Sequence, residues 1–278
     1  MRKGTLALCA AILLILAFSA ALVSACSLQA GHRDSLQAST PAGSPAAAIS
    51  PVKVVREMLG QVDRTRALED LRRLTGEEPI CTAADCYTIT NRLTGSEGLR
   101  RATDYLAGEL EDLGYSVEFR EWSRRGRSDR NLIARKPGVV APREEVYFVA
   151  HVDGVGPNNV DRFPAADDNA SGVVDLLEVA RVLSSHQFSR TLVLLFSTGE
   201  EQGTLGVRSY LDELSDPELA AIKVAVDVDV IGYDGNDDRV MELWHGDGPK
   251  SMVVTQMMSD TIRAYGLDLV PALTPGCG

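Results

Sequence analysis

The sequence predicts an α/β fold with a mainly parallel central sheet and helices on both of its faces. Apolar runs of strand length lie at residues 146–150 and 191–196, as expected for strands buried in a parallel sheet. Amphipathic stretches with helical spacing, such as residues 171–185, alternate with these runs along the chain. The length of 278 residues suits one large domain or two small ones, with enough chain for a full hydrophobic core.

The first 51 residues have the composition of a targeting segment followed by a tether. Arg2 and Lys3 precede the apolar residues 6–23, and small residues then lead to Cys26. This order predicts a lipoprotein-type signal peptide over residues 1–25, with acylation of Cys26. An uncleaved membrane anchor and a soluble secreted enzyme remain alternatives. Residues 26–51, rich in Ala, Ser, Gly, Gln and Pro, predict a flexible tether, so the folded domain is expected at 52–278.

Apolar spacing places the elements of that domain in order. Residues 52–75 and 96–113 have helical spacing, and Gly114 ends the second helix. The basic residues from Arg124 to Arg130 are interpreted as a solvated loop. Asn169 or Ser171 is expected to cap the helix at 171–185. Further helices are expected at 206–214 and 251–265, and strands at 115–119, 131–135, 146–150, 191–196 and 223–231.

The charge and the cysteines limit the possible partners and the compartment. The net charge is −11, and removing Arg2 and Lys3 with the signal leaves it near −13. Such acidity argues against a nucleic-acid partner, because phosphate binding needs a basic surface, and it suits a protein that holds cations. Cys81 and Cys86 can form a disulfide across a short loop in an exported chain, and two free thiols are the alternative. Cys277 has no evident partner.

Acidic residues and one histidine cluster at the ends of the expected strands. Glu200 and Glu201 follow the run at 191–196, and His151 with Asp153 follows the run at 146–150. Two more pairs, Asp167 with Asp168 and Asp227 with Asp229, lie in similar places. The carboxyl ends of parallel strands meet at one edge of the sheet, and carboxylates gathered there repel one another unless a cation compensates. The pattern therefore indicates a hydrolytic metal site.

Each cluster also has an interpretation without metal. His151 can be a structural histidine, and Asp167 to Asn169 can cap the following helix. The two glutamates can form an exposed turn, although the glycines on both sides favour a tight, specific loop. Asp227 and Asp229 can lie on the wet face of an edge strand. The shared position at strand ends favours the metal site over these four separate explanations.

Five motifs in order carry a resemblance to a known family. They are Leu-Thr-Gly-Ser-Glu-Gly at 93–98, His-Val-Asp at 151–153, Ala-Asp-Asp-Asn-Ala-Ser-Gly at 166–172, Thr-Gly-Glu-Glu-Gln-Gly at 198–203 and Asp-Val-Ile-Gly-Tyr at 229–233. From about residue 55 to its end the chain resembles the co-catalytic di-zinc aminopeptidases, which include secreted bacterial leucyl-type enzymes and are related to glutamate carboxypeptidase. The resemblance implies the three-layer fold of zinc exopeptidases.

The same resemblance implies a role for each motif residue. His151 and Asp229 bind one Zn2+, Asp167 bridges both ions with a cis peptide bond to Asp168, and Glu201 binds the second ion. Glu200 is the general base, and Asp153 orients His151. Cobalt or manganese could replace zinc with this ligand set.

One family residue has no counterpart here. The family places a second histidine in a Ser-Asp-His segment after the last aspartate ligand, and no such segment follows Asp229. Of the other histidines, His32 lies in the tether, His186 at a helix end and His245 after Trp244, where a structural or surface role is expected. The domain is therefore expected to lack its C-terminal part, with weak metal occupancy and little activity.

These observations predict an exported metallo-aminopeptidase that acts on peptides, without nucleic acid, and that is held to a membrane by lipid on Cys26. One alternative is a glutaminyl-peptide cyclase with a single zinc ion on the same fold. Another is a non-catalytic binding protein, as in transferrin-receptor ectodomains. The Glu200–Glu201 pair and His151 speak against the binding protein, whereas the absent histidine speaks for it.

Overall fold

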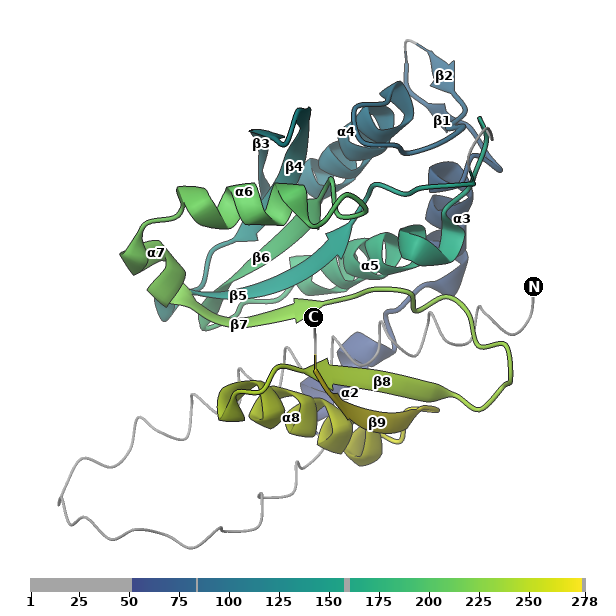
Figure 1. Cartoon of the computed structure of the whole chain (residues 1–278). Coiled ribbons are helices and arrows are strands. Elements are labelled where there is room, and N and C mark those ends of the chain that lie inside the picture. The colour runs from purple at the N-terminus through teal and green to yellow at the C-terminus, as the bar shows by residue number, and fades with distance from the viewer. Residues whose placement is uncertain (1–51, 84, 158–160, 277–278) are drawn as a thin grey trace, which may run out of the picture. The chain divides into compact units, whose positions relative to one another are not determined.

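The computed structural model describes residues 52–83, 85–157 and 161–276 (Figure 1). These residues form two compact units. The first comprises residues 61–237, and the second comprises residues 52–60 together with 238–276. The predicted signal peptide, tether and lipid site at Cys26 lie outside the described residues.

A five-stranded sheet forms the centre of residues 61–237. Its order is β3-β4-β6-β5-β7. The strands are β3 (Ser116–Arg124), β4 (Arg127–Lys136), β5 (Ala141–His151), β6 (Arg190–Ser197) and β7 (Ile222–Asp227). β6, β5 and β7 run parallel, whereas β3 and β4 pair antiparallel with each other and β4 with β6. The predicted α/β class is confirmed, and the sheet is mixed.

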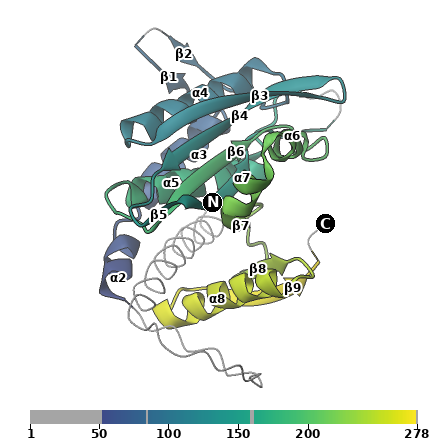
Figure 2. The ribbon, with the colours of Figure 1, turned by 90° about the vertical axis from the view of Figure 1, so that its left-hand side faces the viewer.

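Helices cover both faces of this sheet (Figure 2). On one side lie α3 (Arg64–Leu74), α4 (Glu97–Asp112) and α5 (Gly172–Ser184), and on the other lie α6 (Leu205–Glu213) and α7 (Asp216–Ala221). Side chains alternate between the faces. Odd-numbered β5 and β6 residues such as Tyr147, Val193 and Leu195 pack with Tyr210 of α6. The even-numbered Phe148 and Phe196 are fully buried on the opposite face, where α5 contacts both strands.

Polar side chains fix where the helices begin. Asp63 accepts hydrogen bonds from the backbone N–H groups of Thr65 and Arg66 and so starts α3. Ser96 caps α4 in the same way through Leu99 N–H. Asn169 Oδ1 accepts from Gly172 N–H at the start of α5. Of the two caps expected for α5, Asn169 is the one whose side chain bonds the helix.

Two expectations about residues 52–130 are wrong. Residues 52–75 do not form one helix, because the chain divides at Gly60 into α2 (Lys53–Leu59) and α3. The basic residues around Arg125 are not a loop but the tip of the β3–β4 hairpin. This hairpin pairs without interruption from Ser116 opposite Arg135 to Arg124 opposite Arg127.

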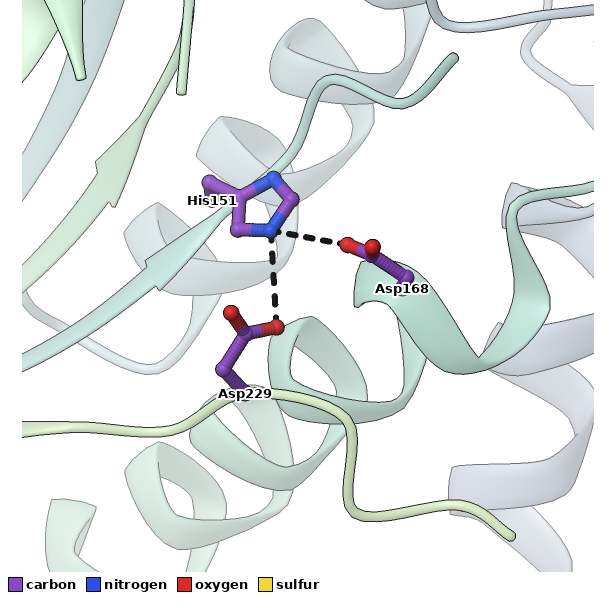
Figure 3. A group of neighbouring side chains, drawn as sticks. All are labelled: His151, Asp168 and Asp229. Atoms are coloured by element: carbon purple, nitrogen blue, oxygen red, sulfur yellow. Dashed lines mark ion pairs between the residues drawn. The ribbon is translucent and has the colours of Figure 1, made fainter. Parts of the chain in front are cut away.

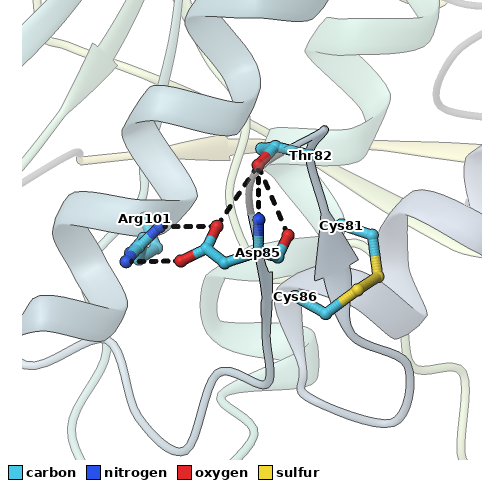
Figure 4. The surroundings of a disulfide bond; sticks show 5 residues. All are labelled: Cys81, Thr82, Asp85, Cys86 and Arg101. Atoms are coloured by element: carbon cyan, nitrogen blue, oxygen red, sulfur yellow. Dashed lines mark hydrogen bonds and ion pairs between the residues drawn. A yellow bond between two sulfur atoms is a disulfide. The ribbon is translucent and has the colours of Figure 1, made fainter.

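A small disulfide hairpin precedes α4 (Figure 4). Cys81 ends β1 (Ile80–Cys81), Cys86 begins β2 (Cys86–Tyr87), and their sulfurs are bonded, as predicted. Asp85 in the intervening turn exchanges hydrogen bonds with Thr82 and forms an ion pair with Arg101 of α4 at 3.0 Å. This pair attaches the hairpin to the helix.

The second unit is a β-α-β arrangement. β8 (Val240–His245) and β9 (Val270–Pro275) pair in parallel, and α8 (Pro249–Tyr265) connects them and contacts both. Tyr265 of α8 accepts a hydrogen bond at its hydroxyl from the backbone N–H of Val52, just before α2. In the described residues, no helix has both the length and the apolar character needed to cross a membrane.

Candidate metal centre

The strand register brings the predicted site residues to one edge of the sheet. His151, the last residue of β5, pairs with Ser197 at the end of β6, and Val149 pairs with Asp227 at the end of β7. Glu200 and Glu201 follow β6, and Asp229 follows β7, which is shorter than expected. The segment η2 (Ala166–Ser171), which leads into α5, carries Asp167 and Asp168.

His151 is the buried centre of the site (Figure 3). Its imidazole is almost fully buried, and Nδ1 forms a 3.0 Å hydrogen bond with the backbone oxygen of Asp153, which fixes the ring. Nε2 lies 3.1 Å from Asp168 Oδ1 and 3.4 Å from Asp229 Oδ1. Neither contact has the geometry of a hydrogen bond, so Nε2 has no hydrogen-bond partner within the described residues.

Asp168, rather than Asp167, contacts the histidine. Asp167 Oδ1 accepts a 2.7 Å hydrogen bond from Gly232 N–H, which holds that carboxylate on the segment after β7. The cis peptide bond expected between Asp167 and Asp168 instead joins Asp168 to Asn169, so that expectation is wrong by one residue. His151, Asp168 and Asp229 form the one potential metal-binding group found in the described part of the chain.

Glu200 and Glu201 lie on a tight turn between β6 and α6. Gly203 and Thr204 both donate backbone hydrogen bonds to the Glu200 carbonyl. Gly199 has φ +73°, and a Cβ there would lie 2.6 Å from the Trp122 ring, so this position requires glycine. Glu201 lies outside the group around His151, and its Oε1 accepts from Val155 N–H.

The carboxylate of Asp153 holds this glutamate turn. It is fully buried, Oδ1 accepts from Glu200 N–H at 3.1 Å, and Oδ2 accepts from Glu201 N–H at 3.3 Å. The contact between Asp153 Oδ1 and His151 Nδ1 is longer, at 3.7 Å. Asp153 thus positions His151 mainly through its backbone oxygen and the two glutamates through its side chain.

Repulsion between the acids gives the site its electrostatic character. Burial raises the pKa of Glu200 and of Glu201, and repulsion from Asp168 and Asp153 raises both further, against the opposing effect of His151. Burial and then Asp229 raise the pKa of Asp227 to about 6. Burial alone would lower the pKa of His151, but Asp153 and Asp229 outweigh it and raise that pKa to about 11. The cluster therefore attracts positive charge.

A divalent cation fits this arrangement. An imidazole nitrogen without a hydrogen-bond partner faces two carboxylate oxygens, and its other nitrogen is fixed by a backbone oxygen, as is usual for a metal-binding histidine. A ligand set of one imidazole and carboxylates suits zinc and related transition metals.

Two residues support the site through contacts that were not expected from the sequence. Arg92 is a buried cation immediately before the Leu-Thr-Gly-Ser-Glu-Gly motif. Asn169 Nδ2 donates to the Val228 carbonyl and so ties η2 to the segment that carries Asp229. The available signal in the sequence is that Arg92 directly precedes one motif and Asn169 lies within another, but this says nothing about their contacts. His245 ends β8 in the second unit, where Nδ1 forms a hydrogen bond with the Gly246 carbonyl.

Known proteins similar to this chain in sequence or fold include aminopeptidases and a glutaminyl cyclase. The aminopeptidase YwaD of Bacillus subtilis is 35% identical over 106 residues, which cover 38% of this chain and 22% of that protein. The zinc aminopeptidase BSAP of Bacillus subtilis has a similar fold, with a TM-score of 0.62 at 16% identity over 76% of this chain and 79% of that one. The Macrostomum lignano glutaminyl cyclase has a TM-score of 0.59 at 18% identity, over 84% of this chain and 78% of that one.

A family model matches just over half of the chain. The aligned segments span less than a third of the length of the curated relatives. Residues 131–275, slightly more than half of the chain, match Peptidase family M28, and they include His151, Asp168, Glu200, Glu201 and Asp229. The chain belongs to peptidase family M28.

Proposed function

We propose that this chain forms the catalytic centre of a zinc-dependent aminopeptidase, which removes N-terminal residues from peptides. The observation that carries the proposal is the buried Nε2 of His151, which faces Asp168 and Asp229 without a hydrogen bond. The family membership and the aminopeptidases among its relatives support peptide bonds as the substrate.

His151, Asp168 and Asp229 would hold one zinc ion. Asp168 takes the role that the resemblance assigned to Asp167, because its oxygen lies near the histidine. Glu201 would contribute to a second ion together with Asp168, whose repulsion helps to raise the pKa of Glu201. A bound zinc ion would act as a Lewis acid that polarises the scissile carbonyl and makes water more acidic.

Glu200 is the proposed general base. It accepts a proton from the attacking water and delivers it to the amine that leaves. The buried carboxylate of Asp153 accepts a hydrogen bond from the backbone N–H of Glu200. This bond fixes the backbone position of the base relative to His151. The raised pKa of Glu200 brings its proton affinity closer to that required near neutral pH.

Zinc binding and hydrolysis of leucine p-nitroanilide by the same preparation test the proposal. We expect zinc to bind and to support weak hydrolysis that a chelator abolishes. Glu200→Gln should retain zinc and lose activity by roughly 10²- to 10⁴-fold, because only the base is removed. His151→Ala should lose zinc and activity together.

Glu111→Gln is the matched control, because this glutamate is exposed on α4. It should behave like the wild type in both assays. Hydrolysis that persists in Glu200→Gln, or in the chelated protein, would refute the mechanism.

A glutaminyl cyclase remains the second candidate. The single metal-binding group in the described residues and the similar fold of a known cyclase favour it. A cyclase would convert an N-terminal glutamine to pyroglutamate with loss of ammonia and would hold one zinc ion. Incubation with a glutamine-initiated peptide, followed by mass spectrometry, distinguishes ring closure from removal of the residue.

Export and acylation of Cys26 complete the proposal. They rest on the composition of residues 1–25 and on the cysteine that follows. Metabolic labelling with a palmitate analogue tests them, with Cys26→Ser as the unlabelled control.

A further inference from the structure

Arg92 is buried, and every hydrogen bond described for its guanidinium goes to a backbone carbonyl oxygen. Its exposed fraction is 1%. Nε donates to the Val152 carbonyl at 2.7 Å, Nη1 to Leu74 at 2.6 Å and Pro164 at 2.9 Å, and Nη2 to Ala165 at 2.8 Å. A buried charge is costly unless hydrogen bonds compensate it, so four bonds to carbonyls indicate a specific role.

Three of these four carbonyls belong to the two segments that carry site residues. Val152 lies between His151 and Asp153, while Pro164 and Ala165 lead directly into η2 and Asp168. The carbonyl of Arg92 also accepts a 3.0 Å hydrogen bond from Gly154 N–H, on the far side of Asp153. One side chain therefore joins the end of β5 to the start of η2.

Thr94, two residues after Arg92, extends this support to the glutamate turn. Its hydroxyl oxygen lies 3.4 Å from Asp153 Oδ2, and the hydroxyl also hydrogen-bonds the side-chain oxygen of Gln202, next to Glu201. Segment 92–94 thus contacts both ends of the segment between β5 and η2, and also the turn that follows β6.

The charge of Arg92 adds to this effect. Burial lowers its pKa to about 10, against the opposing influence of Asp153 and Asp168, so the guanidinium remains charged at neutral pH. This fixed positive charge attracts Asp153 and Asp168 and so offsets part of the repulsion among the acidic residues of the site.

We infer that Arg92 is a positioning residue, which sets the separation of His151 from Asp168 and thereby the metal affinity of the site. This inference rests on the proposed zinc centre. Only the planar guanidinium has enough donors, in a fixed fork, to reach all four carbonyls, so lysine can keep the charge but not the geometry.

Arg92→Lys in the full chain, with zinc affinity measured in zinc-buffered titrations, tests the inference. We expect the dissociation constant for zinc to rise about 10- to 100-fold, as for other changes that disturb the support of metal ligands. Arg181→Lys is the matched control, because Arg181 also has a largely buried side chain within residues 61–237 but bonds carboxylates of α3, α4 and α5. It should lower stability and leave zinc affinity unchanged.

The outcomes separate this inference from the proposed function. If the wild type binds no zinc, both fail. If the wild type binds zinc and a folded Arg92→Lys binds it equally well, the positioning role is refuted and the proposed function stands. If Arg92→Lys does not fold, the Nε–H resonance of Arg92 in the wild type decides: it should exchange slowly and shift during zinc titration, and an unchanged resonance would refute the role.

Discussion

Arg181 is the centre of a buried ionic network, and its removal should destabilise residues 61–237 strongly. Its Nη1 pairs with Asp70 of α3 and lies 3.4 Å from Glu178 of α5, and its Nη2 lies 2.6 Å from Glu109 of α4. The side chains of Asp70 and Glu178 are exposed by 1% and 0%. Arg181→Met keeps the volume but leaves these buried carboxylates without one of their cations.

The expected loss lies near the lower end for broken buried pairs. Removing one partner of such a pair costs about 3–5 kcal/mol. Here Asp70 keeps Arg73 and the Tyr105 hydroxyl, and Glu178 keeps two bonds from Arg66. Because both carboxylates retain a partner, we expect the free energy of unfolding to fall by about 3 kcal/mol.

Urea unfolding followed by tryptophan fluorescence measures this loss. The chain has two tryptophans, Trp122 in β3 and Trp244 in β8, so a Trp244→Phe background reports on residues 61–237 alone. Arg124→Met is the control, because Arg124 pairs with Asp212 at the surface and such pairs contribute little. A loss below about 1 kcal/mol for Arg181→Met would show that the network does not carry the stability assigned to it.

Two further predictions concern stability. Asp175 in α5 is fully buried, and neither carboxylate oxygen has a hydrogen-bond partner within the described residues. Burial, followed by repulsion from Glu178, raises the pKa of Asp175 well above its usual range. The unfolded chain therefore ionises this carboxyl at a lower pH than the folded protein does. As pH rises from about 4 toward the raised pKa, the free energy of unfolding falls by up to about 1.4 kcal/mol per pH unit. Asp175→Asn should therefore gain stability relative to the wild type between about pH 5 and pH 7 in urea unfolding, and an equal difference at both values would contradict this. Replacing Cys81 and Cys86 with serine should lower the free energy of unfolding by about 2 kcal/mol, because the bond closes a loop with a separation of five residues in the unfolded chain. Reduced wild type should match that variant, and an unchanged urea midpoint would rule out this contribution.

The sequence predicts strand ends well because hydrophobic runs mark buried strands. The run at 146–150 locates His151 at the end of β5, and the run at 191–196 locates the glutamate turn after β6. In a parallel sheet these ends share one edge, so the approximate meeting of His151, Glu200 and Asp229 follows from the fold class.

The choice between adjacent residues cannot be made in this way. Asp167 and Asp168 have the same chemistry, and which one faces His151 depends on backbone torsions of η2 that leave no mark in the composition. The same limit applies to Asp227 and Asp229, because alternation along a strand no longer holds once β7 ends at Asp227.

Arg92 shows a different limit. An arginine in a polar segment has no feature in the sequence that separates a buried residue from an exposed one. Its burial results from carbonyl groups of residues 74, 152, 164 and 165, which converge only after folding. The division into helices α2 and α3 at Gly60 likewise leaves no signal in the sequence, because the helical spacing of apolar residues continues across it.

The two hydrogen bonds that Asp153 accepts from the glutamate turn limit which residues can replace this aspartate. An asparagine has the same size and shape, but its amide offers one oxygen and one NH2 group. The two backbone N–H groups of Glu200 and Glu201 each need an acceptor, so one of them would face another donor in a fully enclosed place. At this position the isosteric amide is therefore a poorer substitute than its volume suggests, and the requirement is for two acceptors rather than for shape.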